Sequence, residues 1–147
     1  MLKFKSPLIE AVLIKRYKRF LADVELDNGE IITVHCPNTG SMTNCAQPGW
    51  KVLLSESANK KRKYAHTWEL AINDEGHWIG INTNNANKIV KAALQQRKII
   101  ELAEYGQIIP EYRVGESRID FFMQADGMPD CYLEVKSMTL CENSLGL

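Results

Sequence analysis

Short runs of alternating apolar and polar residues fill the first half of the chain. From Lys15 to Asn82 these runs are rich in β-branched and aromatic residues and are separated by turn residues. The pattern predicts five strands, over residues 16–26, 30–35, 50–55, 64–73 and 77–81. Asp27-Asn28-Gly29 predicts a hairpin between the first two. Five short strands so close together favour a small closed barrel, either OB-like or SH3-like, because closure removes exposed sheet edges.

The pattern changes at Asn82-Thr83-Asn84-Asn85, where strand-like residues give way to a helical period. Asparagine is a favourable N-cap, and apolar residues then recur with near-helical spacing, which predicts a helix over residues 86–104 that ends before Gly106. Three further strands are predicted over residues 108–112, 117–124 and 131–137. We therefore place a domain boundary near residue 83, with a barrel over residues 1–83 and a second domain over residues 84–147.

The last two predicted strands would form a hairpin centred on Gly127. Their shared apolar face is made of Ile119, Phe121, Met123, Cys131, Leu133 and Val135. Asp120, Glu134 and Lys136 fall on the other face. In this register Asp120 lies directly across from Glu134, and Arg118 lies across from Lys136. Opposed side chains have Cβ atoms about 5 Å apart, where two like charges destabilise a sheet.

A divalent cation would offset the repulsion between Asp120 and Glu134. Magnesium prefers oxygen ligands and usually binds through one or two carboxylates, several waters and a phosphate. Lys136 beside such an ion could stabilise charge on a phosphate or assist the attacking water, which suits phosphodiester hydrolysis. The alternative is a solvated hairpin face with ordinary exposed charges, because an isolated D…ExK pattern is common.

The order helix, strand, strand with aspartate, strand with Glu-x-Lys resembles the core of the PD-(D/E)xK nuclease superfamily. There the helix often contributes a further acidic residue. Glu101 and Glu104 are the candidates here. Solvated charges near a helix end are the alternative for both.

Two basic runs lie beside aromatic residues in the barrel half. The first surrounds Tyr17 with Lys15, Arg16, Lys18 and Arg19, and the second contains Lys60, Lys61, Arg62 and Lys63 next to Tyr64. Cations that meet phosphates, beside rings that stack on bases, are the usual chemistry of nucleic-acid binding. OB barrels carry that chemistry on one sheet face and the adjoining loops. A solubilising surface loop is the alternative for the second run.

The segment from Pro37 to Thr43 reads as a loop with many hydrogen-bonding groups. Asn38, Thr39 and Ser41 offer amide and hydroxyl groups, and Gly40 exposes backbone donors, all suited to phosphate or sugar contacts. A simple turn-rich connection is the alternative.

The overall composition limits the classes of function without choosing among them. Eighteen basic and eighteen acidic residues give a net charge of zero, so any nucleic-acid surface must come from local clusters. No apolar run approaches about 18 residues, and the N-terminus lacks a signal-peptide pattern, so we expect a cytoplasmic protein with no membrane partner. The four cysteines form no CxxC pair and the three histidines no HxH or HExxH pattern, which favours buried thiols and structural histidines.

Several separated motifs, in the same order, resemble the sugar fermentation stimulation protein A family. They are Arg16–Val24, His35–Met42, Glu116–Phe121 and Tyr132–Lys136. The resemblance implies a mixed fold, with an N-terminal OB-like all-β barrel followed by a partial α/β PD-(D/E)xK nuclease-like domain. It also implies DNA binding without strong sequence preference, linked to the regulation of sugar utilisation. Carried over residue by residue, Asp120 and Glu134 are the metal positions for Mg²⁺, and Lys136 is the catalytic lysine.

In this family the chain continues well past the Glu-x-Lys strand, whereas this sequence stops at Leu147. We therefore expect a truncated nuclease-like core with an exposed sheet edge, which favours a homo-oligomer or weak folding of the second half. The nuclease activity is expected of the intact form and not of this chain. The alternatives are a purely non-enzymatic DNA-binding transcriptional regulator, or an unrelated small barrel that binds protein and lacks salt-dependent DNA affinity.

Overall fold

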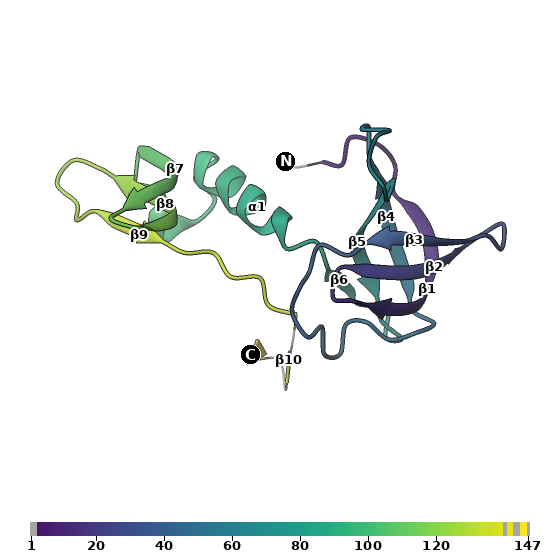
Figure 1. The fold of residues 1–147 in the computed structure, drawn as a ribbon. Helices are drawn as coiled ribbons and strands as arrows, with labels where there is room; N and C mark the ends of the chain where they lie inside the picture. The colour runs from purple at the N-terminus through teal and green to yellow at the C-terminus, as the bar shows by residue number, and fades with distance from the viewer. Residues whose placement is uncertain (1–2, 140, 143–144, 147) are drawn as a thin grey trace. The chain divides into compact units, whose positions relative to one another are not determined.

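The computed structural model describes residues 3–139, 141–142 and 145–146 (Figure 1). It divides the chain into two compact units between Thr83 and Asn84. The barrel unit comprises Lys3–Thr83 together with the described residues from Met138 onward, and the helix–sheet unit comprises Asn84–Ser137. Among the residues described, no helix is both long and apolar enough to cross a membrane.

The barrel unit is built on one six-stranded sheet. Its strands are β1 (Ile9–Tyr17), β2 (Leu21–Leu26), β3 (Ile31–His35), β4 (Lys51–Glu56), β5 (His66–Ile72) and β6 (Trp78–Gly80). Their order is β3-β2-β1-β4-β5-β6, and a parallel pairing of His35 with Thr67 joins β3 to β5 and closes the barrel. Between the two predicted types of barrel, the OB-like one is confirmed.

The inner face of the barrel carries the alternating apolar positions of its strands. Trp68 is completely buried, and its indole N–H donates a 2.9 Å hydrogen bond to the carbonyl oxygen of Leu70. The core around it includes Leu13, Val24, Val34, Cys36, Cys45, Val52, Leu54 and Ile81. Burying these side chains is the main contribution to the stability of this unit.

The prediction of a single strand over residues 16–26 was wrong. β1 ends at Tyr17 and β2 begins at Leu21. Between them Lys18 and Arg19 adopt left-handed backbone conformations, with φ of 51° and 63°. Tight hairpin turns of this kind normally carry Asn or Gly, so a turn made of two basic residues gave no sequence signal. The hairpin predicted at Asp27-Asn28-Gly29 is confirmed between β2 and β3.

The helix–sheet unit places a helical segment on an antiparallel sheet of three strands. Its elements are α1 (Asn84–Gln95), the 3₁₀ helix η1 (Ile100–Leu102), β7 (Gln107–Val114), β8 (Ser117–Gln124) and β9 (Cys131–Leu133). The core contains Leu94, Phe121 and Met123, and Cys131, Leu133 and Val135 of the predicted apolar hairpin face pack against it. Ile119, which was predicted on the same face, is not part of this core. Two short strands assigned to the barrel unit, β10 (Cys141–Glu142) and β11 (Leu145–Gly146), pair with each other.

The helix is shorter than the predicted range of residues 86–104. The amide of Lys98 donates to the carbonyl of Ala93, the amide of Arg97 donates to that of Leu94, and Arg97 has φ of 54°. These two hydrogen bonds form a Schellman motif, which ends a helix. Arginine takes the left-handed position that glycine usually occupies, so the end of α1 had no sequence signal.

The last predicted strand, over residues 131–137, is also shorter in the structure. β9 ends at Leu133, and Lys136 lies beyond the pairing ladder. Arg118 pairs with Arg113 of β7, which lies on the opposite edge of β8 from β9. The predicted pairing of Arg118 with Lys136 is therefore wrong.

Candidate functional site

Arg16, on β1, connects two loops of the barrel unit. Its Nη2 atom donates to the carbonyl oxygens of Arg19, Asn38 and Gly40 at 2.9, 2.8 and 2.8 Å. Its Nη1 atom lies 3.4 Å from the carbonyl oxygen of Ser41. The guanidinium group is therefore engaged with backbone carbonyls, and it holds the β1–β2 turn against the loop that follows β3.

The other residues of the first basic run divide into engaged and exposed side chains. The Tyr17 hydroxyl donates to Asp23 Oδ1 at 2.9 Å, and Thr33 Oγ1 donates to the same oxygen at 2.8 Å. Lys15 Nζ lies 5.3 Å from the centroid of the Tyr17 ring. Lys18 and Arg19 are exposed, so they carry the solvent-facing charge of this turn.

The loop after β3 is internally ordered. Asn38 is only 7% exposed, and its Oδ1 atom accepts a 3.1 Å hydrogen bond from the amide of Gly40. Thr39 and Ser41 are exposed, and Ser41 Oγ lies 3.1 Å from Thr43 Oγ1. Of the three residues predicted to contact nucleic acid here, Thr39 and Ser41 present their side chains to solvent, whereas Asn38 shapes the loop.

The second basic run lies in the loop between β4 and β5. This loop is closed by a 2.7 Å hydrogen bond from the amide of Ser57 to the carbonyl of Ala65. Its exposed side chains include Lys60, Lys61, Arg62 and Lys63. Arg62 Nη2 lies 3.3 Å from Thr67 Oγ1, and Lys63 Nζ lies 5.5 Å from the Tyr64 ring centroid. The four charges are thus carried by a folded loop.

Strand pairing links the two basic loops through β3. Leu21, which directly follows the β1–β2 turn, pairs with His35 at the end of β3. His35 in turn pairs with Thr67, which Arg62 contacts. OB barrels bind oligonucleotides with the face of their second and third strands, with the loop between strands 1 and 2, and with the loop between strands 4 and 5. The basic residues therefore lie in the loops that this fold uses for nucleic acid.

In the helix–sheet unit the predicted register of β8 with β9 is confirmed as far as the two strands pair. The last pair of the ladder is Phe121 with Leu133, one residue before the predicted pair of Asp120 and Glu134. The backbone ladder stops there, because the amide of Val135 donates a 2.7 Å hydrogen bond to Asp120 Oδ2. A side-chain oxygen thus takes the place of the next strand carbonyl.

Asp120 is held in its ionised form. The hydrogen bond from the Val135 amide lowers the pKa of its carboxyl group, burial opposes this, and the hydrogen bond from Asn87 lowers the pKa further. Lys136 adds a smaller effect in the same direction.

Glu134 and Lys136 form an exposed ion pair. Lys136 Nζ lies 3.7 Å from Glu134 Oε2, and both side chains are at least half exposed. Across the described part of the chain, no group of three His, Cys, Asp or Glu side chains could hold a metal ion. A cation here would therefore have two carboxylate ligands at most, and solvent or a phosphate would supply the rest, which is the pattern magnesium tolerates.

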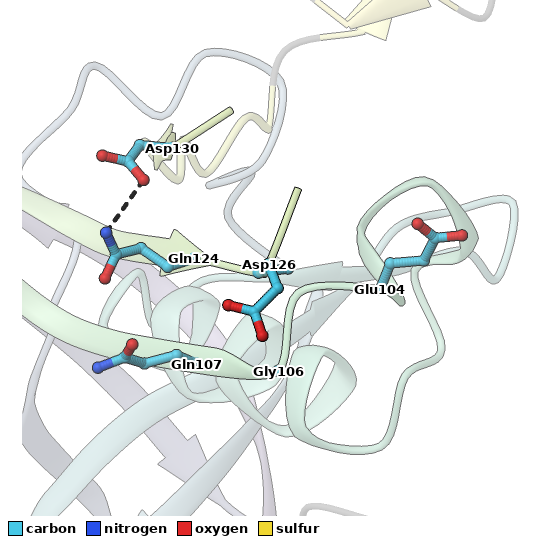
Figure 2. Close-up of a pocket in the computed structure, with 7 residues that line it drawn as sticks. Glu104, Gly106, Gln107, Gln124, Asp126 and Asp130 are labelled. Atoms are coloured by element: carbon cyan, nitrogen blue, oxygen red, sulfur yellow. Dashed lines mark hydrogen bonds between the residues drawn. The ribbon is translucent and has the colours of Figure 1, made fainter. Parts of the chain in front are cut away.

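Sequence reasoning missed the residue by which α1 contacts this site. Asn87, in the first turn of the helix, donates from Nδ2 to Asp120 Oδ1 at 2.7 Å. Glu101 lies in η1, and Glu104 lines an open pocket of about 440 Å³ together with Asp126 and Asp130 (Figure 2). The helical contact to Asp120 is therefore an amide and not one of the two predicted glutamates.

Comparison with known protein families accounts for almost the whole chain. Residues 14–81 match the family described as the SfsA N-terminal OB domain, and residues 84–147 match the sugar fermentation stimulation protein RE domain. This chain belongs to the sugar fermentation stimulation protein family. The predicted resemblance is confirmed.

Relatives in this family are similar along nearly all of the chain. A sugar fermentation stimulation protein homolog of Pseudoalteromonas atlantica is 56% identical over 99% of this chain and 63% of the relative. The homolog of Pasteurella multocida is 53% identical over 96% of this chain and 60% of the relative. The chain thus spans about three fifths of the length of these curated relatives.

A solved structure has a similar fold. It is described as the structure of Pyrococcus furiosus SfsA in complex with Ca²⁺. The two chains align with a TM-score of 0.80 at 26% sequence identity, over 96% of this chain and 59% of the other. The family assignment therefore rests on both sequence and fold.

Proposed function

We propose that this chain binds DNA without preference for base sequence, through the basic loops of its OB barrel. The observation that carries this proposal is the location of Lys18 and Arg19 in one loop and of Lys60–Lys63 in another, linked by the pairing of His35 with Thr67. Both loops belong to the oligonucleotide-binding side of an OB barrel. Neutralised phosphates release counterions, so such contacts give affinity for any sequence.

The local clusters matter because the whole chain has no net charge. Eighteen basic residues balance eighteen acidic ones, so there is no long-range attraction to a polyanion. Binding must come from short-range contacts at the two loops, and it should fall steeply as salt is added.

Charge reversal in the second loop tests this proposal. We expect Lys60→Glu with Lys61→Glu to weaken DNA binding and to reduce the magnitude of the slope of log K against log salt by about 0.9 for each phosphate that the loop no longer neutralises. Lys88→Glu with Lys91→Glu, two exposed lysines of α1, changes the net charge equally and is the matched control. Equal losses of affinity in both variants would remove the loop from the binding site.

We further propose that Asp120 and Glu134 form a divalent-cation site, with Mg²⁺ as the ion, in a PD-(D/E)xK nuclease-like domain. The hydrogen bond from the amide of Val135, the neighbour of Glu134 in the chain, to Asp120 Oδ2 supports this, because opposed carboxylates repel each other and a bound cation would offset that repulsion. The Ca²⁺ in the description of the Pyrococcus furiosus relative is consistent with a divalent ion in this family. Lys136 would stabilise negative charge on a phosphate at that ion.

Thermal unfolding with and without Mg²⁺ tests the cation site. Saturation a hundredfold above Kd would stabilise the fold by about 2.7 kcal/mol. Glu134→Ala should abolish that increase, while Glu116→Ala, an exposed glutamate near the start of β8, should retain it. Stabilisation by Mg²⁺ without strand cleavage would support a non-enzymatic DNA-binding regulator, and the absence of any stabilisation would reject the site.

A further inference from the structure

Phe20 is an aromatic side chain that the barrel leaves in solvent. It is 46% exposed, although the next residue, Leu21, is buried at the start of β2. The nearby aromatic Tyr17 is occupied, since its hydroxyl is bonded to Asp23 and Lys15 lies over its ring. Phe20 therefore offers an apolar ring to a ligand at this turn, whereas Tyr17 serves the structure of the strand face.

The backbone that carries Phe20 is fixed on both sides. Lys18 and Arg19 have left-handed conformations that such residues rarely adopt, and these persist only where the surroundings hold them. Arg16 binds the carbonyl of Arg19 at 2.9 Å, and the amide of Cys36 donates to the carbonyl of Phe20 at 2.7 Å. A ring on a fixed turn loses little freedom when it binds, which favours affinity.

The chemistry around the ring indicates the kind of ligand. Lys18 and Arg19 precede it with two exposed positive charges, and Arg16 ties its turn to the loop of Thr39 and Ser41. A flat apolar surface beside cations and hydroxyl groups complements a nucleobase with its flanking phosphates. In an intact duplex the faces of the bases are covered by stacking, so a ring can reach a base face only where bases are unpaired or are forced apart.

We infer that Phe20 stacks on an unpaired base and that the barrel unit prefers single-stranded DNA to intact duplex. This inference rests on the proposed function, because it requires that the barrel binds DNA. It adds a substrate class to that function. It also assigns stacking to Phe20, and phosphate contacts to Lys18 and Arg19.

The test compares the full chain with its variants on a single-stranded oligonucleotide and on the same sequence as a duplex. Wild type should bind the single strand more tightly. Phe20→Ala should lower single-strand affinity roughly 5- to 100-fold, which is the range expected for removal of one base stack, with an unchanged salt slope. Phe20→Trp should retain binding. Phe4→Ala is the matched control, because Phe4 is also 46% exposed and lies between two lysines.

The outcomes separate this inference from the proposed function. Equal wild-type affinity for both DNA forms, or equal effects of Phe20→Ala and Phe4→Ala, would overturn the inference while leaving DNA binding in place. Absence of binding to either form would overturn both. A thermal unfolding curve for Phe20→Ala that matches wild type would show that any decrease in affinity comes from the ring and not from the fold.

Discussion

Asn87 Nδ2 lies 2.7 Å from Asp120 Oδ1, so a helix residue orients a strand carboxylate at the proposed cation site. The Val135 amide occupies the other oxygen of the same carboxylate at 2.7 Å. Each oxygen has one fixed donor and retains a lone pair for a metal ion. Partners of this kind fix the direction of a ligand and are part of the design of a metal site.

Removing Asn87 should weaken the site without removing a ligand charge. We expect Asn87→Ala to lower Mg²⁺ affinity roughly 10- to 100-fold, because the carboxylate loses one of the two bonds that orient it. The measurement is the Mg²⁺ concentration at which the increase in unfolding temperature is half complete. Gln95→Ala, at the exposed end of the same helix, is the control and should leave that midpoint unchanged.

The lowered pKa of Asp120 predicts a pH dependence of stability. Because the folded-state pKa lies below the ordinary value, the ionised carboxylate contributes fully above the unfolded pKa of about 3.9, and the contribution is lost as pH falls through the folded-state value. The stability difference between wild type and Asp120→Asn should therefore be constant at neutral pH and shrink below about pH 4. Urea unfolding across this range measures it, and a difference that grows on acidification would contradict the assigned cause.

Arg16 should affect DNA binding by positioning the two loops and not by contacting a phosphate. Charged hydrogen bonds to carbonyls contribute about 1.5–3 kcal/mol each, so Arg16→Ala should destabilise the barrel and lower DNA affinity. The slope of log K against log salt for Arg16→Ala should stay close to that of wild type. For Arg19→Ala we expect the magnitude of this slope to fall by about 0.9, with little loss of stability. A reduced slope for Arg16→Ala would show instead that Arg16 itself contacts a phosphate.

The two cysteines of the barrel core should react slowly. Burial raises the pKa of the thiols of Cys36 and Cys45, so little reactive thiolate is present at neutral pH. Cys131 is only partly buried. Among these three cysteines, iodoacetamide should therefore label Cys131 first in the folded protein, and it should label the three at similar rates in urea. Early labelling of Cys36 or Cys45 would show that the core opens readily.

The sequence contained enough information for the barrel and for the register of the β8–β9 hairpin. Turn residues such as Gly29 and the strict alternation along β8 and β9 have a direct structural meaning, and the β2–β3 hairpin and the β8–β9 register are confirmed. The predictions of the β1–β2 turn and of the end of α1 were wrong for the same reason. Lys18–Arg19 and Arg97 take left-handed conformations without glycine or asparagine, so nothing in the residue types marked the turn or the helix end.

The contacts of individual polar side chains could not be predicted from the sequence. Arg16 was expected among the nucleic-acid contacts, but its guanidinium binds carbonyls from residues up to 25 positions away. Asn87 was not anticipated, since its partner Asp120 lies 33 residues further along the chain. Such contacts depend on how the loops and elements pack, which local patterns do not encode.

The binding of labelled DNA by the full chain across a salt series from about 50 to 200 mM tests the central claim most directly. Two oligonucleotides of unrelated sequence should bind with similar affinity, and log K should fall linearly with log salt for both. Affinity that does not depend on salt, or no binding at the lowest salt, would contradict the account.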